Sequence, residues 1–260
     1  MAYTAIDDPS AYFQTAIYSG SSSDVAVTNN GNSNLKPDWL WIKQRSSTEN
    51  HMVVDSTRGV TKYLQADTTA AEATVTSRVE TLDTDGFTLN GASNPVNASG
   101  ATYVGWQWKA NGGTTASNTD GDINSTVQVN QDAGFSIVTY TGNGSTSDQT
   151  IGHGLGVRAN AVILKNRDSA VNWVVWSEGV DANHSLELNT ADSISDSTQG
   201  RVLSNAGSRG TSTIFSIRSG SGSVIQTNTS GEDYVAYCFA EKQGYSRFSS
   251  YKGNGNANGP

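Results

Sequence analysis

Few residues of this 260-residue chain could carry acid–base or nucleophilic chemistry. It has three histidines, His51, His153 and His184, and one cysteine, Cys238. Nucleophilic catalysis needs such a group next to a base and an acid. We interpret His153, in the glycine-rich residues 151–156, as a turn residue whose ring packs on a neighbour, with a catalytic imidazole as the alternative. We expect no enzyme active site.

Four aspartates have the spacing of calcium ligands. Asp83 and Asp85 precede Gly86, and Asp120 and Asp122 flank a glycine, so oxygen ligands alternate as at the start of a calcium loop. Neither stretch has the glutamate that completes an EF-hand loop. We expect ordinary turns and no cofactor, with calcium as the alternative.

Two cation pairs recur in the chain. Lys43 and Arg45 end one apolar run, and Lys165 and Arg167 end another. Residues two apart share a face of a strand. The pairs therefore predict polar strand ends whose stems cover an apolar rim. The alternative is contact with a neighbouring subunit or an acidic glycan.

Two tryptophan pairs could bind sugars. Trp39 and Trp41 form one pair, and Trp106 and Trp108 the other. Each pair shares a strand face, which favours burial in a core over an exposed stacking platform. We keep Trp39 and Trp108 as binding or interface candidates.

Strands must position these residues. Apolar residues occur in short β-branched and aromatic runs such as 38–43, 160–165 and 172–176, and residues 135–140 and 213–217 alternate. Glycine, asparagine and aspartate separate the runs. The pattern predicts an all-β chain of sandwich or barrel type. Residues 68–78 are the best helical candidate, with a turn or two at most.

The sequence repeats itself. Residues 13–20 return as 135–142, and Trp41-Ile-Lys-Gln-Arg45 returns as Ile163-Leu-Lys-Asn-Arg167, both 122 residues later. We expect a first β-sandwich at 1–110, a linker or excursion at 111–130, a second sandwich at 131–243, and a truncated third repeat at 244–260. The alternating residues 123–130 predict a strand that leads into or pairs with the second copy.

Composition narrows the function classes. The net charge of −8 disfavours electrostatic binding to nucleic acid and to anionic membranes. One cysteine excludes an internal disulfide, and we expect a buried, inert thiol. The first residues lack the features of a signal peptide, so we expect no secretion by the signal-peptide route. No run reaches 18 apolar residues, so we expect no membrane span.

Two stretches carry a family resemblance. They are Phe135-Ser-Ile-Val-Thr-Tyr-Thr-Gly-Asn-Gly144 with the strand ending Lys165-Asn-Arg167, and Pro37-Asp-Trp-Leu-Trp-Ile-Lys-Gln-Arg45 with Asp55-Ser-Thr-Arg-Gly59. They resemble a repeat domain of tail-fibre-like and other structural proteins of marine bacteriophages, notably cyanophages. The resemblance implies jelly-roll-like sandwiches of the concanavalin/laminin-G type. The second copy departs from it, with Ser177-Glu-Gly179 in place of the Asp-Ser-x-Arg-Gly stretch.

The resemblance implies a non-enzymatic virion protein assembled in the host cytoplasm. Its expected partners are other tail or capsid proteins, further copies of itself, and host-surface glycans, to which it would adhere. Linked modules raise overall affinity by roughly 10²–10⁴. The alternatives are a capsid decoration or head-fibre protein, and a glycan-degrading tail enzyme.

Overall fold

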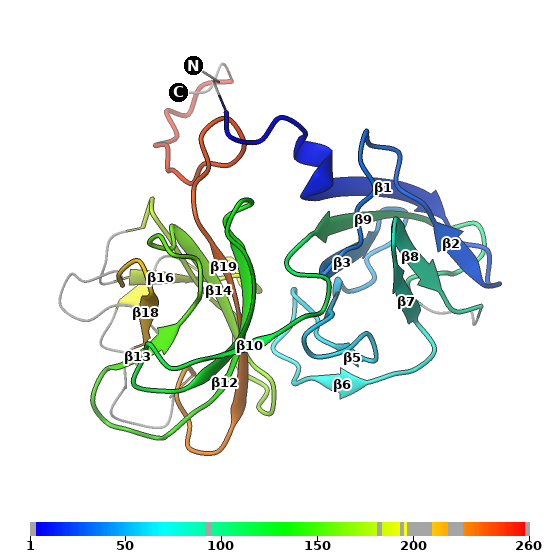
Figure 1. Cartoon of the computed structure of the whole chain (residues 1–260). Helices are drawn as coiled ribbons and strands as arrows, with labels where there is room; N and C mark the ends of the chain where they lie inside the picture. Colours follow the sequence, from blue (N-terminus) through cyan, green and yellow to red (C-terminus); the bar gives the residue numbers. More distant parts are fainter. Residues whose placement is uncertain are drawn as a thin grey trace.

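The computed structural model describes residues 4–91, 95–180, 184–192, 195–196, 210–217 and 226–257. These residues form an all-β protein of several antiparallel sheets, consistent with a β-sandwich, as the sequence pattern predicts. Within them the only helical element is the 3₁₀ turn η1 (Pro9–Ala11). None of their helices has the length and hydropathy that a membrane crossing requires. The strands gather into two units that lie side by side (Figure 1).

The first unit contains strands β1 to β9. A four-stranded sheet has the order β1-β9-β3-β4, a three-stranded sheet the order β2-β8-β7, and β5 pairs with β6. The bounds are β1 (Phe13–Ser19), β2 (Val25–Val27), β3 (Trp39–Gln44), β4 (Met52–Asp55), β5 (Lys62–Tyr63), β6 (Ala73–Thr74), β7 (Val79–Asp83), β8 (Gly86–Leu89) and β9 (Thr102–Trp108).

Buried and half-buried side chains alternate along these strands, and the buried ones form the first core. In β9, Tyr103, Gly105 and Gln107 are buried while the residues between them are half-buried. Successive strand side chains point to opposite faces, so one face of the four-stranded sheet packs on the three-stranded sheet. Leu40, Ile42 and Met52 meet Phe87 and Leu89 in this cluster, and all of them are almost fully buried.

The second unit contains strands β10 to β19. An eight-stranded sheet has the order β10-β11-β12-β19-β14-β15-β16-β17, and β13 pairs with β18. The bounds are β10 (Ala116–Asn118), β11 (Ser125–Asn130), β12 (Phe135–Thr141), β13 (Gln149–Gly152), β14 (Ala161–Asn166), β15 (Val174–Ser177), β16 (His184–Glu187), β17 (Ser195–Asp196), β18 (Ile214–Ile217) and β19 (Asp233–Phe239).

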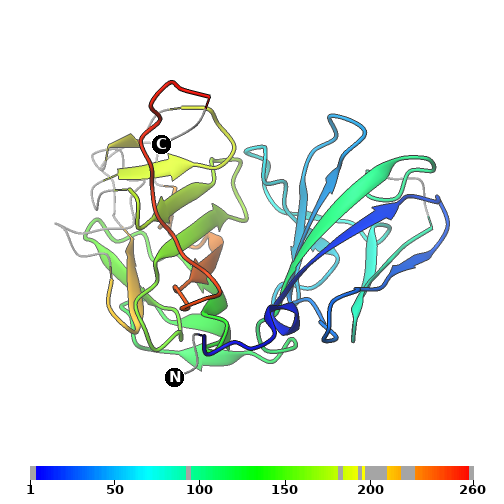
Figure 2. The same ribbon diagram turned by 90° about the horizontal axis from the view of Figure 1, so that it is seen from above.

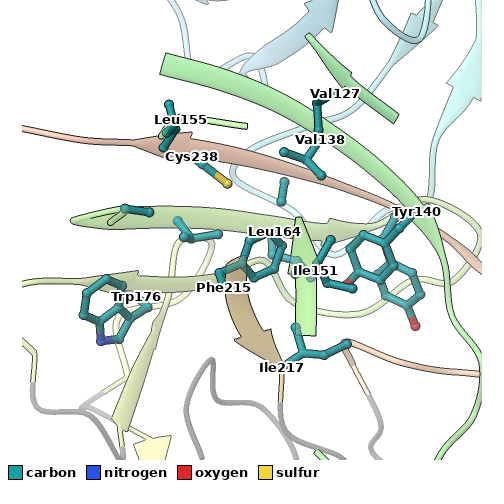
Figure 3. Packing of buried hydrophobic residues seen from close by; sticks show 14 of the residues in the cluster. Val127, Val138, Tyr140, Ile151, Leu155, Leu164, Trp176, Phe215, Ile217 and Cys238 are labelled. Atoms are coloured by element: carbon teal, nitrogen blue, oxygen red, sulfur yellow. The ribbon is translucent and has the colours of Figure 1, made fainter. Parts of the chain in front are cut away.

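The second core lies between the eight-stranded sheet and the β13–β18 pair. Figure 3 shows Ile151 and Phe215 from that pair among side chains of the large sheet such as Leu164 and Val138. Cys238 on β19 is fully buried in the same cluster, and burial raises the pKa of its thiol. The prediction of a buried cysteine on a strand is confirmed.

The two units share a strand order. In the first, β1 pairs with β9, β9 with β3, and β3 with β4. In the second, β12 pairs with β19, β19 with β14, and β14 with β15. Details recur as well: the Tyr103 hydroxyl accepts a hydrogen bond from Ala98 N, and the Tyr234 hydroxyl accepts one from Thr229 N.

The region between the units carries more structure than a linker. Residues 111–130 were expected as a linker or excursion, and they contain β10 and β11. Strand β11 pairs with β12 from Ser125↔Tyr140 to Asn130↔Phe135, as the alternating pattern predicted. The eight-stranded sheet therefore extends into this segment.

The helix expected within residues 68–78 is a wrong prediction. The segment holds turns and the short strand β6, and Glu72 N donates to Arg167 O of the second unit. Four threonines give this segment a weak helix propensity. Contacts with the second unit then decide its conformation.

Asn97 provides a test of the first core. It is fully buried; its Oδ1 accepts from Ser21 N, and its Nδ2 donates to Ser23 O and Asn90 O. Asn97→Ala should lower the free energy of unfolding by about 1–3 kcal/mol, because buried backbone groups lose their partners. Urea unfolding measures this. Asn111→Ala, at an exposed turn, is the control, and an equal loss there would contradict the assignment.

Candidate functional site

The outer faces of the two large sheets face each other. Residues that alternate with the core positions form an apolar surface on each sheet, and the two surfaces meet in a third buried cluster that includes Trp39 and Val53 from the first unit and Phe135, Trp173 and Tyr237 from the second. We call this contact the joint. Figure 2 shows the two units side by side, with the joint between them.

Trp39 lies at the centre of the joint. Only 1% of its surface is exposed. Its ring stacks on Tyr237 with centroids 4.3 Å apart and planes 19° apart, and the Trp108 ring lies 4.3 Å away on its own sheet. Aromatic pairs of this kind contribute about 0.5–1.5 kcal/mol beyond the area they bury.

A buried ionic network closes one end of the joint. The Arg58 guanidinium donates to Asp55 Oδ2 at 2.6 Å and to Glu72 Oε2 at 2.7 Å. Arg167 of the second unit donates to both Glu72 oxygens, at 2.9 and 3.0 Å. The Tyr237 hydroxyl donates to Asp55 Oδ2 at 2.7 Å and accepts from Arg58. In this way Asp55 of the first unit binds Tyr237 of the second, and Glu72 of the first binds Arg167 of the second.

The network shifts the ionisation of its members. Burial alone would raise the pKa of Glu72, but hydrogen bonds and charge from Arg167 and Arg58 outweigh it, so the pKa lies below its usual value. Burial raises the pKa of Tyr237 well above that of a free tyrosine. At neutral pH both arginines are charged, the Glu72 carboxyl is ionised and the tyrosine is neutral.

Two further polar side chains hold the segment that connects the units. Asp38 Oδ2 accepts from Ala110 N at 2.7 Å and from Gly112 N at 2.9 Å. Gln128 Oε1 accepts from Asn111 N and Gly113 N, while its Nε2 donates to hydroxyls of the first unit. Gly112 and Gly113 both have positive φ, which glycine adopts without strain.

The other end of the joint opens into a cleft of about 450 Å³. Rings from both sheets and from the two terminal segments line it, and its lining includes no charged residue. We call it the aromatic cleft. Its lining residues are Tyr12, Phe13, Trp39, Trp41, Trp108, Ala133, Phe135, Ala161, Ile163, Val175, Ser177, Phe239, Tyr245, Ser246 and Phe248.

The terminal segments form one wall of the aromatic cleft. The Tyr12 and Tyr245 rings meet edge to face with centroids 6.3 Å apart. Phe248 packs on Phe239 at 5.7 Å. Residues 244–260 were expected as the start of a third repeat, and the described part of this stretch runs along the second unit, where Gly179 leaves room for Ser250.

The four tryptophans expected in pairs do not behave alike. Trp39 is buried, as a core residue would be, whereas Trp41, Trp106 and Trp108 are half-buried. Trp39, Trp41 and Trp108 all line the aromatic cleft, but Trp106 does not. The Trp41 indole donates to His51 Nδ1 at 2.9 Å, and the Trp39 Nε1 is buried without a hydrogen-bond partner among the described residues.

The two lysines of the cation pairs donate hydrogen bonds to backbone carbonyls of the loops that follow their own strands. Lys43 Nζ donates to the carbonyls of Gln44, Ser47 and Glu49. Lys165 is fully buried, and its Nζ donates to Ser169 O and Val171 O and, across the joint, to Thr69 O. Burial lowers the pKa of Lys165 to about 8.

The two arginines of these pairs have different surroundings. Arg167 belongs to the ionic network, and its guanidinium also lies 3.7 Å from Asp233. Arg45 is exposed at the end of its strand. Of the four cations, it is the one that the structure leaves exposed.

The four aspartates weighed as calcium ligands accept hydrogen bonds, some from neighbours in the sequence and some from distant residues. Asp83 accepts from Thr81 and Thr88, and Asp85 from Leu35 N. Asp122 accepts from Thr150 N and from its hydroxyl, while Asp120 Oδ2 accepts from Asn118. The described part of the chain contains no group of three or more histidine, cysteine or acidic side chains placed to hold a metal ion.

His153 is a buried turn residue. Its Nδ1 accepts from Leu155 N at 3.1 Å, and its Nε2 lies 3.4 Å from Thr211 O. Burial lowers the pKa of the ring, so the imidazole is neutral near pH 7. The residue is fully buried.

Sequence reasoning missed the residues that make the joint and the cleft wall. Arg58, Glu72 and Tyr237 were not singled out, nor were Tyr12 and Tyr245. The Asp55-Ser-Thr-Arg58-Gly59 stretch, present in one copy and absent from the other, was a usable signal. A feature kept by one copy alone can mark a contact that the two copies do not share.

The chain is thus an all-β protein whose two units share one joint and one aromatic cleft. A family model described as "Domain of unknown function (DUF7483)" matches residues 8–260, and the chain belongs to this family. Neither the comparison with curated proteins nor that with solved structures finds a significant match.

Removing Arg58 should weaken the joint strongly. Arg58→Met leaves Asp55 and Glu72 buried with fewer partners, and the free energy of unfolding should fall by about 3–5 kcal/mol in urea. Arg158→Met is the matched control, because its pair with Glu178 is 38% and 30% exposed and should matter by less than about 1 kcal/mol. Equal losses of unfolding free energy in the two variants would contradict the expectation that the buried network stabilises the protein more than an exposed ion pair does.

The ionic network should also set part of the acid sensitivity. Because the folded-state pKa of Glu72 lies below the ordinary value of 4.5, its stabilisation is complete above that pH and is lost as the pH falls through the folded pKa. Wild-type stability should therefore fall below pH 4.5 more steeply than that of Glu72→Gln. Urea titrations at several pH values measure both slopes, and identical slopes would refute the assignment.

Proposed function

We propose that this chain is a non-catalytic structural protein of a bacteriophage virion, tail-fibre-like, and that its aromatic cleft binds host-surface glycan. In this proposal the two units are tandem, homologous sandwiches of the jelly-roll, concanavalin/laminin-G type. Other virion proteins hold the particle end, and further copies of the chain associate with it.

The observation that carries the proposal is the aromatic cleft itself. Trp41 and Trp108 from one sheet and Phe239 from the other present rings around a space of about 450 Å³, within the usual range for small-ligand sites of roughly 300–1,000 Å³. The apolar C–H face of a sugar packs on such rings. The joint fixes the rings in advance, which lowers the entropy cost of binding.

The lining of the cleft argues for binding over hydrolysis. Glycoside hydrolysis needs two carboxyl groups flanking the bond that breaks. The cleft lining includes neither an acid nor a histidine. A glycan seated there would meet rings and two serines, which can hold a sugar but supply no general acid.

The tandem arrangement is supported by two independent features. The sequence repeat returns residues 13–20 at 135–142, and the order β1-β9-β3-β4 matches β12-β19-β14-β15. A copied module that keeps its sheet and changes its outer contacts suits a structural protein. The resemblance to marine bacteriophage repeat domains adds the virion setting.

Glycan binding predicts a contrast between two tryptophans on one strand. Trp108→Ala should weaken binding about tenfold or more on an array of bacterial-surface glycans, because a ring in the cleft is lost. Trp106→Ala is the matched control: it is half-buried on the same face of β9 but lies outside the cleft, and it should bind as wild type does. Equal behaviour of both variants would exclude the cleft as the site.

Two further measurements separate this proposal from its rivals. Purified chain incubated with the bound glycan should release no new reducing ends; release that disappears when one acid is changed would identify an enzyme. Gold-labelled antibody on intact particles should mark the tail. Label on the shell would identify a capsid decoration protein, and unlabelled particles would exclude a virion role.

A further inference from the structure

Strand β1 leaves one edge of the four-stranded sheet open. The strand order places β1 and β4 at the two edges. The β4 edge is covered, because Val53 and Leu64 exchange backbone hydrogen bonds of 2.9 and 3.0 Å. The backbone of β1 has no equivalent partner on its outer side among the described residues.

The free backbone groups of β1 can be assigned. Lys109 N donates to Tyr12 O, and Gly20 N donates to Ala101 O, so even-numbered residues turn their backbone groups toward β9. In an antiparallel pair the alternate residues face the other way. The amides and carbonyls of Phe13, Thr15, Ile17 and Ser19 therefore point out of the sheet.

The second unit contains the same kind of edge with a strand on it. Strand β12 occupies the position of β1 in the shared strand order, and the repeat places Phe13 at Phe135 and Ile17 at Thr139. Strand β11 pairs antiparallel along β12, with Gln128 opposite Ile137. The edge of the second unit that corresponds to β1 is thus occupied by an antiparallel strand of the same chain.

Strand β1 also lacks the usual protection of an edge. Natural edge strands carry charges, proline or bulges that discourage pairing with another chain. Residues 13–19 have neither a charge nor a proline, and they pair with β9 in unbroken register. The Ile17 side chain is 68% exposed, beside Val104 on β9.

We infer that β1 pairs antiparallel with β1 of a second copy of this chain. A two-fold axis at Ile17 sets its side chain against its own copy and sets Thr15 opposite Ser19, with the outward backbone groups of both strands in hydrogen-bonding register. An uncharged strand permits this approach although each chain carries a net charge of −8. Two-fold dimers of this kind are the commonest closed oligomers. Phe13, at the start of β1, also lines the aromatic cleft, but Ile17 at the axis does not, and the association test uses no glycan.

Sedimentation equilibrium of the full chain tests the pairing. Wild type should associate with concentration to twice its mass of 27.4 kDa. Ile17→Lys places like charges across the axis and should be monomeric over the same range. Val157→Lys is the matched control, since Val157 is 46% exposed on the second unit, and it should dimerise as wild type does.

Hydrogen exchange of the wild type gives an independent reading. The amides of Thr15, Ile17 and Ser19 should exchange slowly at concentrations where the dimer forms and quickly where the monomer dominates. The inference is overturned if wild type stays monomeric, as it would if the edge takes a strand from a different protein. It is also overturned if folded Ile17→Lys dimerises like wild type, or if these amides exchange quickly in the dimer.

Discussion

The contact between two apolar sheet faces governs the architecture of this protein. Each large sheet buries one face in its own core, and the alternation of side chains leaves aromatic and aliphatic residues on the other. Water would contact Trp39, Trp173 and Tyr237 if the units separated, and all three are almost fully buried in the joint. The positions of the connecting segment, the ionic network and the aromatic cleft all follow from this contact.

The joint is asymmetric although the units share a strand order. The first unit contributes Asp55, Arg58 and Glu72, and the second contributes Tyr237 and Arg167. Two units that meet through non-equivalent side chains need different contact residues. This agrees with the presence of the Asp-Ser-x-Arg-Gly stretch in the first unit and its absence at the corresponding place in the second.

His51 and Trp173 are 122 residues apart, the same shift as the sequence repeat, and their surroundings differ. His51 accepts a hydrogen bond from Trp41 at the side of the aromatic cleft, whereas Trp173 lies in the joint and donates to Gln65 O of the first unit. The two residues therefore make different contacts.

Much of the local structure could be predicted from the sequence, because strand periodicity is a local property. The runs at 38–43, 135–140 and 160–165 lie largely in strands β3, β12 and β14. The contact partners could not be predicted, since Trp39 and Trp106 have the same pattern and differ only in what covers them. For the same reason Lys165 looked like a strand-end cation, yet its ammonium is buried beside a carbonyl of the other unit. Burial by a distant segment is a tertiary property that no short window encodes.

The stacking of Trp39 on Tyr237 gives the joint an optical signature. These rings belong to different units, and with centroids 4.3 Å apart they are close enough for their electronic transitions to couple. Near-ultraviolet circular dichroism is sensitive to fixed aromatic packing, whereas the far-ultraviolet signal follows the strands. Separation of two intact units would therefore change the first spectrum and spare the second, so the protein reports the state of its own joint without an added label.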